Sequence, residues 1–136
     1  VDLGLIEEAK KVLKTETSSK MYEKVKGKLE DITLDIIIES AKEGDSVAHQ
    51  LIEDAGVNLG VRVAYLINLF NPEVVVIGGG VEKAGELLLN PVKKTVKKFA
   101  FEEPASIVKI VPSILGENAV SLGAASLVVR EVFMKA

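Results

Sequence analysis

The sequence predicts an α/β protein in which long helices pack on short parallel strands. Val74–Ile77 is an unbroken run of β-branched residues, which is typical of a strand covered on both faces. Residues 107–111 form a second short apolar run, and residues 84–98 between the two runs have the apolar spacing of a helix. A strand, a helix and a further strand in this order favour parallel strands joined by a right-handed crossover.

The composition is that of a globular domain. The chain has 136 residues, 48% of them hydrophobic, which is enough for one domain with a buried core. Its net charge of −3 argues against nucleic-acid binding by these residues, which would favour a basic domain. The chain has no cysteine, so we expect no disulfide framework, no thiolate zinc site and a reducing, cytoplasmic location. No apolar run reaches the roughly 20 residues of a membrane-spanning helix.

The first part of the chain is predicted to be helical. Residues 2–13 carry apolar side chains at intervals of three and four, which indicates one helix. A polar break follows. Met21, Val25 and Leu29 then indicate a short second helix, which Gly27 weakens.

The next two predicted helices have clear start signals. Thr33 is placed to cap residues 34–43, because its hydroxyl can accept a hydrogen bond from a free backbone N–H group of the first turn. Gly44 suits the end of that helix, and Asp45 is placed to cap the following one. The helix that follows is the longest, at about Ser46–Phe70.

This long helix is predicted to bury one wide face. It should end at Asn71, because the residue before a proline is disfavoured in helical geometry. Gly56 and Gly60, four residues apart, should let another element approach the helix backbone closely. The apolar stripe comprises Ala48, Leu51, Ile52, Ala55, Leu59, Val63, Leu66, Ile67 and Phe70.

The remaining elements leave the predicted sheet small. The second strand should end at Pro112, and a last helix is expected at about 118–134. Two short strands do not make a stable sheet, since three or more are normally needed. We therefore expect the missing strands upstream or in a partner chain. In the helix at 84–98, the side chains expected to face the core are Leu87, Leu88, Val92 and Val96.

The candidate binding site is the run Gly78, Gly79 and Gly80, directly after the first strand. Ligands of open α/β sheets gather at the carboxyl ends of the strands. Backbone without Cβ atoms can approach a nucleotide closely, and the following helix would offer its N-terminal N–H groups to an anion. The run is neither a P-loop nor a complete G-x-G-x-x-G motif, because Lys83 stands where the third glycine belongs. A tight turn without a ligand is the alternative.

Other polar residues have simpler interpretations. His49, the one histidine, is expected on the hydrated side of the long helix, and no carboxylate pair is spaced to bind a metal with it. Glu82, Glu86 and Glu117 lie near loop or helix starts, where they suit the helix dipole. Without a Ser/His/Asp or Cys/His constellation, catalysis by these residues alone is not expected. The basic face of the helix at 84–98 is expected to be solvated, with contact to an anionic partner as the alternative; its residues are Lys93, Lys94, Lys97 and Lys98.

Two stretches closely resemble the C-terminal part of the ROK family, which contains bacterial sugar-responsive repressors and sugar kinases. They are "LINLFNPEVVVIGGGVEKAGELLLNPVKK" and "VPSILGENAVSLGAASLVV". The match extends over nearly the whole chain, since "ITLDIIIESAKEGDSVAHQLIEDAGVNLGVRVAYLINLFNPE" is similar to the family's long-helix region. The resemblance implies the distal half of the second lobe of an actin/hexokinase-like ATPase fold. Because the chain starts at Val1, we expect residues 1–136 to be the C-terminal portion of a longer ROK-type protein.

The resemblance also implies a nucleotide site in those members that are kinases. Carried over, Gly78, Gly79 and Gly80 would approach ATP, used with Mg²⁺, and Gly116 would lie nearby. The family's phosphate loop, catalytic aspartate, Glu-x-x-His sugar contact and cysteine-rich zinc motif do not occur in this chain. No catalytic or metal-binding residue is therefore assigned.

The resemblance leaves a sugar-responsive repressor and an ATP-dependent sugar kinase as alternatives. The retained glycine run favours ATP binding, whereas the ending "GENAVSLGAASLVVREVF" looks more like that of the regulators. We favour the repressor, with a sugar effector and a homodimer as expected partners. Operator DNA would be bound only through an N-terminal domain that is not in this chain.

Overall fold

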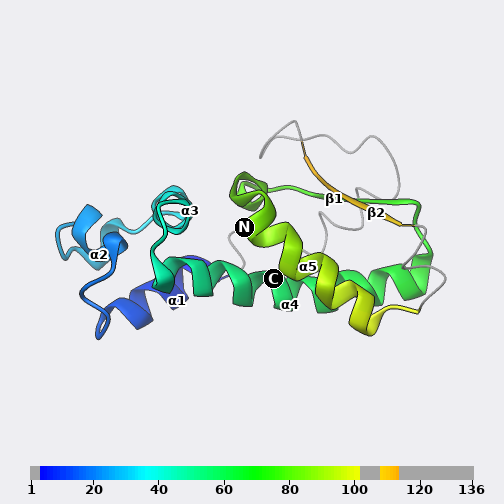
Figure 1. Cartoon of the computed structure of the whole chain (residues 1–136), viewed down its shortest axis with the longest axis horizontal. Coiled ribbons are helices and arrows are strands. Elements are labelled where there is room, and N and C mark those ends of the chain that lie inside the picture. Colours follow the sequence, from blue (N-terminus) through cyan, green and yellow to red (C-terminus); the bar gives the residue numbers. More distant parts are fainter. Residues whose placement is uncertain (1–3, 102–107, 114–136) are drawn as a thin grey trace.

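A computed structural model describes residues 4–101 and 108–113. Figure 1 shows α4 running along the molecule, with α1, α2 and α3 at the end where it begins, and α5 and the sheet beside its second half. In the described ranges, no helix is both long and apolar enough to cross a membrane. The elements are α1 (Leu5–Leu13), α2 (Lys20–Lys24), the 3-10 helix η1 (Leu29–Asp31), α3 (Leu34–Lys42), α4 (Ser46–Phe70), β1 (Val74–Ile77), the 3-10 helix η2 (Val81–Ala84), α5 (Glu86–Phe99) and β2 (Lys109–Pro112).

The first two helices are shorter than the apolar spacing predicted. Gly4 has a φ of +74°, a left-handed conformation that cannot continue a helix, so α1 begins at Leu5. α2 ends at Lys24, because Lys26 and Gly27 have positive φ angles of 54° and 79°. Leu29 consequently lies in η1 and not in a continuation of α2.

The long helix α4 confirms the predicted bounds. Its C-cap Asn71 adopts a left-handed conformation with a φ of +45°. Ile67 is fully buried, but Phe70 at the end of the predicted stripe is 61% exposed, so the inward placement of Phe70 is wrong. The large, fully buried side chains around which the helices and β1 pack include Leu13, Met21, Ile37, Ile52, Leu59, Ile67, Ile77 and Leu88.

The two glycines of α4 form the close seam that was predicted. A Cβ atom on Gly56 would lie 2.7 Å from Cβ of Pro91 and 2.9 Å from the carbonyl oxygen of Leu88. A Cβ atom on Gly60 would lie 2.6 Å from Cβ of Thr95. The helix that approaches α4 is therefore α5. It can lie this close only because Gly56 and Gly60 have no side chains.

The strands β1 and β2 pair in parallel, as predicted, with Val75 opposite Ile110 and Ile77 opposite Pro112. β2 begins at Lys109 and includes Pro112, so its predicted bounds are shifted. Proline has no N–H group, and the ladder is continued by Ser113 N–H, which donates to the Ile77 carbonyl at 2.7 Å. Val75 and Ile77 are buried, whereas the alternate β1 residues are half-buried, so only one face of β1 is fully covered.

Asp45 joins the starts of two helices. One carboxylate oxygen, Oδ2, accepts hydrogen bonds from Ala48 N–H in α4 and from the Ser19 hydroxyl, both at 2.9 Å. The other, Oδ1, accepts from Lys20 N–H at 2.9 Å, at the start of α2. Burial raises the pKa of Asp45, but these hydrogen bonds outweigh burial and the pKa is lowered from its ordinary value of 3.8. Asp45 is thus the predicted cap of α4 and also fixes α2 against it.

Ser40 is a polar residue in the core. Its side chain is fully buried in α3, and among the described residues its hydroxyl has no hydrogen-bond partner. A buried polar group without a partner costs about 1–3 kcal/mol, so Ser40→Ala is expected to leave the free energy of unfolding unchanged or raise it by about 1 kcal/mol. Denaturant unfolding of the two proteins measures this. A loss of more than about 1 kcal/mol would mean that the hydroxyl is satisfied in solution.

Candidate functional site

The glycine run lies at the carboxyl end of β1, where its ligand-binding role was predicted. Gly79 and Gly80 have positive φ angles of 90° and 102°, so a side chain at either position would be strained. A Cβ atom on Gly78 would lie 3.2 Å from Cβ of Ser113, at the end of β2. The absence of side chains is therefore required by the turn itself and by the close approach of the neighbouring strand end.

The turn is closed by a carboxylate from the chain itself. Glu82 is 9% exposed, and its Oε2 accepts a hydrogen bond from Gly80 N–H at 2.7 Å. A backbone N–H group at such a turn is the kind of donor that holds a bound phosphate. Here that donor already has a carboxylate partner within the chain.

The helix after the glycine run begins two residues later than predicted, at Glu86 instead of residue 84. Val81–Ala84 form the 3-10 helix η2, and α5 begins only at Glu86. Between them, Gly85 has a φ of +59° and a ψ of −134°, and its carbonyl accepts from Leu88 and Leu89 N–H at 3.1 and 3.0 Å. The segment η2 and Gly85 therefore lie between Gly80 and the N-terminus of α5, whose N–H groups the phosphate interpretation offers to an anion.

The loop also meets α3. Lys83 Nζ lies 3.7 Å from Asp35 Oδ1, with both side chains more than half exposed. An ion pair of this kind is worth little in stability. It does bring Asp35 of α3 beside Lys83 of η2, an approach that no local pattern predicts.

The other candidates have no structural partners that indicate chemistry. His49 is half-exposed, in agreement with its predicted hydrated position. Its Nδ1 lies 3.8 Å from Oε2 of Glu53, one turn further along α4. Glu86 is exposed in the first turn of α5, as its helix-dipole interpretation predicts. Within residues 4–101 and 108–113, no cluster of acidic or histidine side chains could hold a metal ion. Gly116 and Glu117 lie outside the described residues.

Comparison with known proteins identifies the class of this arrangement. The fold matches a ROK family glucokinase from Streptomyces griseus, solved with glucose and AMPPNP, with a TM-score of 0.76 and 23% identity over 100% of this chain and 43% of that one. A ROK family transcriptional regulator matches with a TM-score of 0.74 and 26% identity over 94% of this chain and 31% of that one. The chain thus has the actin/hexokinase-like α/β fold that the family resemblance implies.

The family model described as "ROK family" matches residues 10–131. A xylose repressor from Caldicellulosiruptor bescii is 35% identical over 76% of this chain and 26% of its own length. A glucokinase from Thermotoga maritima is 34% identical over 85% of this chain and 36% of its own length. The chain therefore belongs to the ROK family, and it spans about a quarter to a third of the curated relatives that it matches.

Proposed function

We propose that the protein is a cytoplasmic, sugar-responsive transcriptional regulator of the ROK family. Residues 1–136 would be the C-terminal portion of its effector-binding and dimerisation module, acting as a homodimer. The observation that carries this proposal is the hydrogen bond from Gly80 N–H to the buried carboxylate of Glu82. With it, a carboxylate of the chain itself takes the backbone N–H group that the phosphate interpretation of the glycine run would offer to a nucleotide. A sugar sensor does not require that N–H group.

The mechanism that follows is a shift between two populations. A sugar that binds one arrangement of the lobes more tightly than the other increases the population of that arrangement. The size of the shift is set by the ratio of the two affinities. DNA-reading domains outside this chain would be moved or released as a result. The described residues would provide a rigid part of the sugar-binding module, since the close seam between α4 and α5 leaves little room for relative movement.

A sugar kinase that uses ATP and Mg²⁺ is the second candidate. It is favoured by the retained turn at Gly78, Gly79 and Gly80, of which Gly79 and Gly80 have positive φ angles that glycine adopts easily. The glucokinase from Thermotoga maritima, at 34% identity, supports the same candidate. In that case the loop would contact the adenosine part of ATP, and the phosphates would be held by residues outside this chain.

Thermal unfolding of the protein expressed from its complete gene separates the two functions. The melting temperature is measured with a panel of sugars, with ATP–Mg²⁺, and with both. A ligand of the folded state at a hundredfold excess over its Kd adds about 2.7 kcal/mol of stability. We expect a higher midpoint with one sugar and no change with ATP–Mg²⁺. A shift with ATP that a sugar enlarges would instead establish the kinase.

The variant Glu82→Gln is a matched control for the charge of the loop. Its amide oxygen can still accept from Gly80 N–H, but the negative charge is gone. A response to ATP–Mg²⁺ in this variant alone would identify the carboxylate as the group that excludes the nucleotide.

A further inference from the structure

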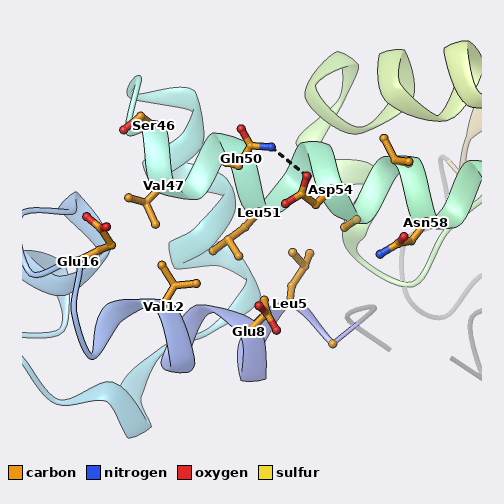
Figure 2. A pocket seen from close by; sticks show the side chains of 13 residues that line it. Leu5, Glu8, Val12, Glu16, Ser46, Val47, Gln50, Leu51, Asp54 and Asn58 are labelled. Carbon is orange, nitrogen blue, oxygen red and sulfur yellow. Dashed lines mark hydrogen bonds between the residues drawn. The ribbon is translucent and has the colours of Figure 1, made fainter.

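An open groove of about 940 Å³ lies between α1 and the first half of α4. Figure 2 shows Leu5 and Val12 of α1 and Val47 and Leu51 of α4 on its two sides, turned toward one another. Val12 and Val47 are only half-buried, so apolar surface remains accessible in the groove. A groove with apolar sides between two helices suits the apolar face of a third helix.

The charged residues that line this groove are all acidic. Among the described residues they are Glu8, Glu16 and Asp54, with no lysine or arginine. Asp54 Oδ1 accepts a hydrogen bond from Gln50 Nε2 at 2.9 Å, which fixes one of the carboxylates at the edge of the groove (Figure 2). The groove therefore favours an occupant that combines apolar side chains with positive charge.

The second half of α4 carries a surface with this chemistry. Tyr65 and Leu69, one turn apart, are 60% and 75% exposed. Arg62 is exposed next to them and forms no ion pair within the part of the chain that the structure describes. At about 100° per residue, this surface lies on the side of α4 away from Gly56 and Gly60, so α5 does not cover it. We call Arg62, Tyr65 and Leu69 the Tyr65 face.

The groove and the Tyr65 face lie on the same side of α4, one along each half. Val47, Leu51 and Asn58 of the groove project to that side at the same helical spacing. A second α4 that runs antiparallel and is centred on Asn58 therefore brings Tyr65 opposite Leu51 and Leu69 opposite Val47. Both large apolar side chains of the Tyr65 face then lie against the apolar sides of the groove.

The charges match in the same register. An antiparallel α4 centred on Asn58 brings Arg62 opposite Asp54, and Glu8 lines the same groove from α1. A single centre thus pairs both apolar side chains and the exposed cation of the Tyr65 face with suitable partners. Such self-complementarity is the property of an isologous surface, which closes as a dimer.

We propose that a second copy of this chain fills the groove with the Tyr65 face of its α4, and that the two α4 helices are antiparallel across a two-fold axis at Asn58. Each copy supplies one groove and one face, so the contact is made twice. In each copy α5 packs on the other side of α4 and stays outside the contact. The proposal rests on the homodimer proposed above and names its interface.

Charge reversal with recovery tests the proposal. The dimer Kd of the protein from its complete gene is measured by sedimentation equilibrium. Arg62→Glu, and separately Glu8→Lys with Asp54→Lys, are each expected to raise the Kd by about tenfold or more, because like charges then face one another. A chain with all three changes is expected to recover most of the affinity.

Lys97→Glu is the matched control for Arg62→Glu. It makes the same change of charge at an exposed position of α5, outside the proposed contact, and should leave the Kd unchanged. Tyr65→Glu tests the apolar part of the interface and is expected to weaken the dimer. This side chain is 60% exposed, so the melting temperature of the monomer should not fall.

A cysteine at the proposed axis tests the register. Asn58→Cys is expected to give a disulfide-linked dimer under mild oxidation, in excess of any that the wild type forms, because the axis brings the two copies of this position together. Gln50→Cys is the matched control on the same side of α4. Its two copies would lie roughly 24 Å apart along the helices, too far for a disulfide.

Four results would overturn the proposed interface. A dimer that none of these changes weakens would leave the homodimer standing but place its interface elsewhere. Weakening without recovery in the combined chain, or equal cross-linking at positions 50 and 58, would rule out the register. A lower melting temperature for Tyr65→Glu with an unchanged Kd would mean that another part of the same protein covers the face. A wild-type protein that is monomeric at every concentration would exclude the homodimer as well as the interface.

Discussion

Replacement of Asp45 by alanine is expected to lower the free energy of unfolding by about 3 kcal/mol, the largest effect of any single polar substitution that we predict. The change removes the N-cap of α4. It also leaves the Ser19 hydroxyl and Lys20 N–H without the acceptor that they now share. Denaturant unfolding of the protein from its complete gene measures the loss. Thr33→Ala is the matched control, because Thr33 caps α3 through one exposed bond and should cost only about 1 kcal/mol.

The same carboxylate makes the stability depend on pH at the acidic end. The pKa of Asp45 is lower in the folded state than its ordinary value of 3.8, which applies when the chain is unfolded. Its contribution is therefore fully present above about pH 4 and is lost as the pH falls through the folded-state pKa. Asp45→Asn should remove this part of the acid dependence. An unchanged acid profile in that variant would show that Asp45 does not carry it.

Replacement of Gly60 or Gly56 by alanine is expected to destabilise the protein by about 2 kcal/mol each, although alanine favours helix by about 1 kcal/mol. At Gly60 the new methyl group would lie 2.6 Å from Cβ of Thr95 and 3.0 Å from the Val92 carbonyl oxygen. At both positions one of the crowded atoms is a backbone carbonyl oxygen of α5, which cannot turn aside as a flexible side chain can. The whole of α5 would have to move away from α4.

The control for this pair is Asn58→Ala on the exposed side of α4. It makes a smaller gain in helix propensity, without a neighbour of α5 to displace, and should raise stability by up to about 0.5 kcal/mol. If the glycine variants are as stable as this control, α4 and α5 are not packed as closely in solution as the seam requires.

Features set by neighbouring residues were predictable from the sequence. The bounds of α4 follow from a cap at Asp45 and a stop at Asn71, and both are local signals. The β-branched run predicted β1, and the spacing of Gly56 and Gly60 predicted a close helix approach. Each of these depends on short-range sterics or on a pattern within one element.

The sequence could not predict features that depend on contacts between distant residues. The bonds of Asp45 to Ser19 and Lys20 span more than twenty residues and have no sequence signature. The bond between Gly80 and Glu82 is local, but an acidic residue near a helix start fits an ordinary dipole role equally well. Gly85 was an available signal that α5 begins only at Glu86, and the prediction did not use it. The α1–α4 groove depends on how two helices pack, which apolar spacing does not specify.

The length of α4 has a mechanical consequence. Twenty-five residues at about 1.5 Å each make a rod roughly 37 Å long. At the start of α4, Asp45 accepts a hydrogen bond from α2, and in the middle of α4, Gly56 and Gly60 pack closely against α5. A rod held in this way transmits force by tilting as a whole, with little bending. The helix therefore holds α2, bonded to Asp45 at its start, and β1, which follows its end, at a fixed separation.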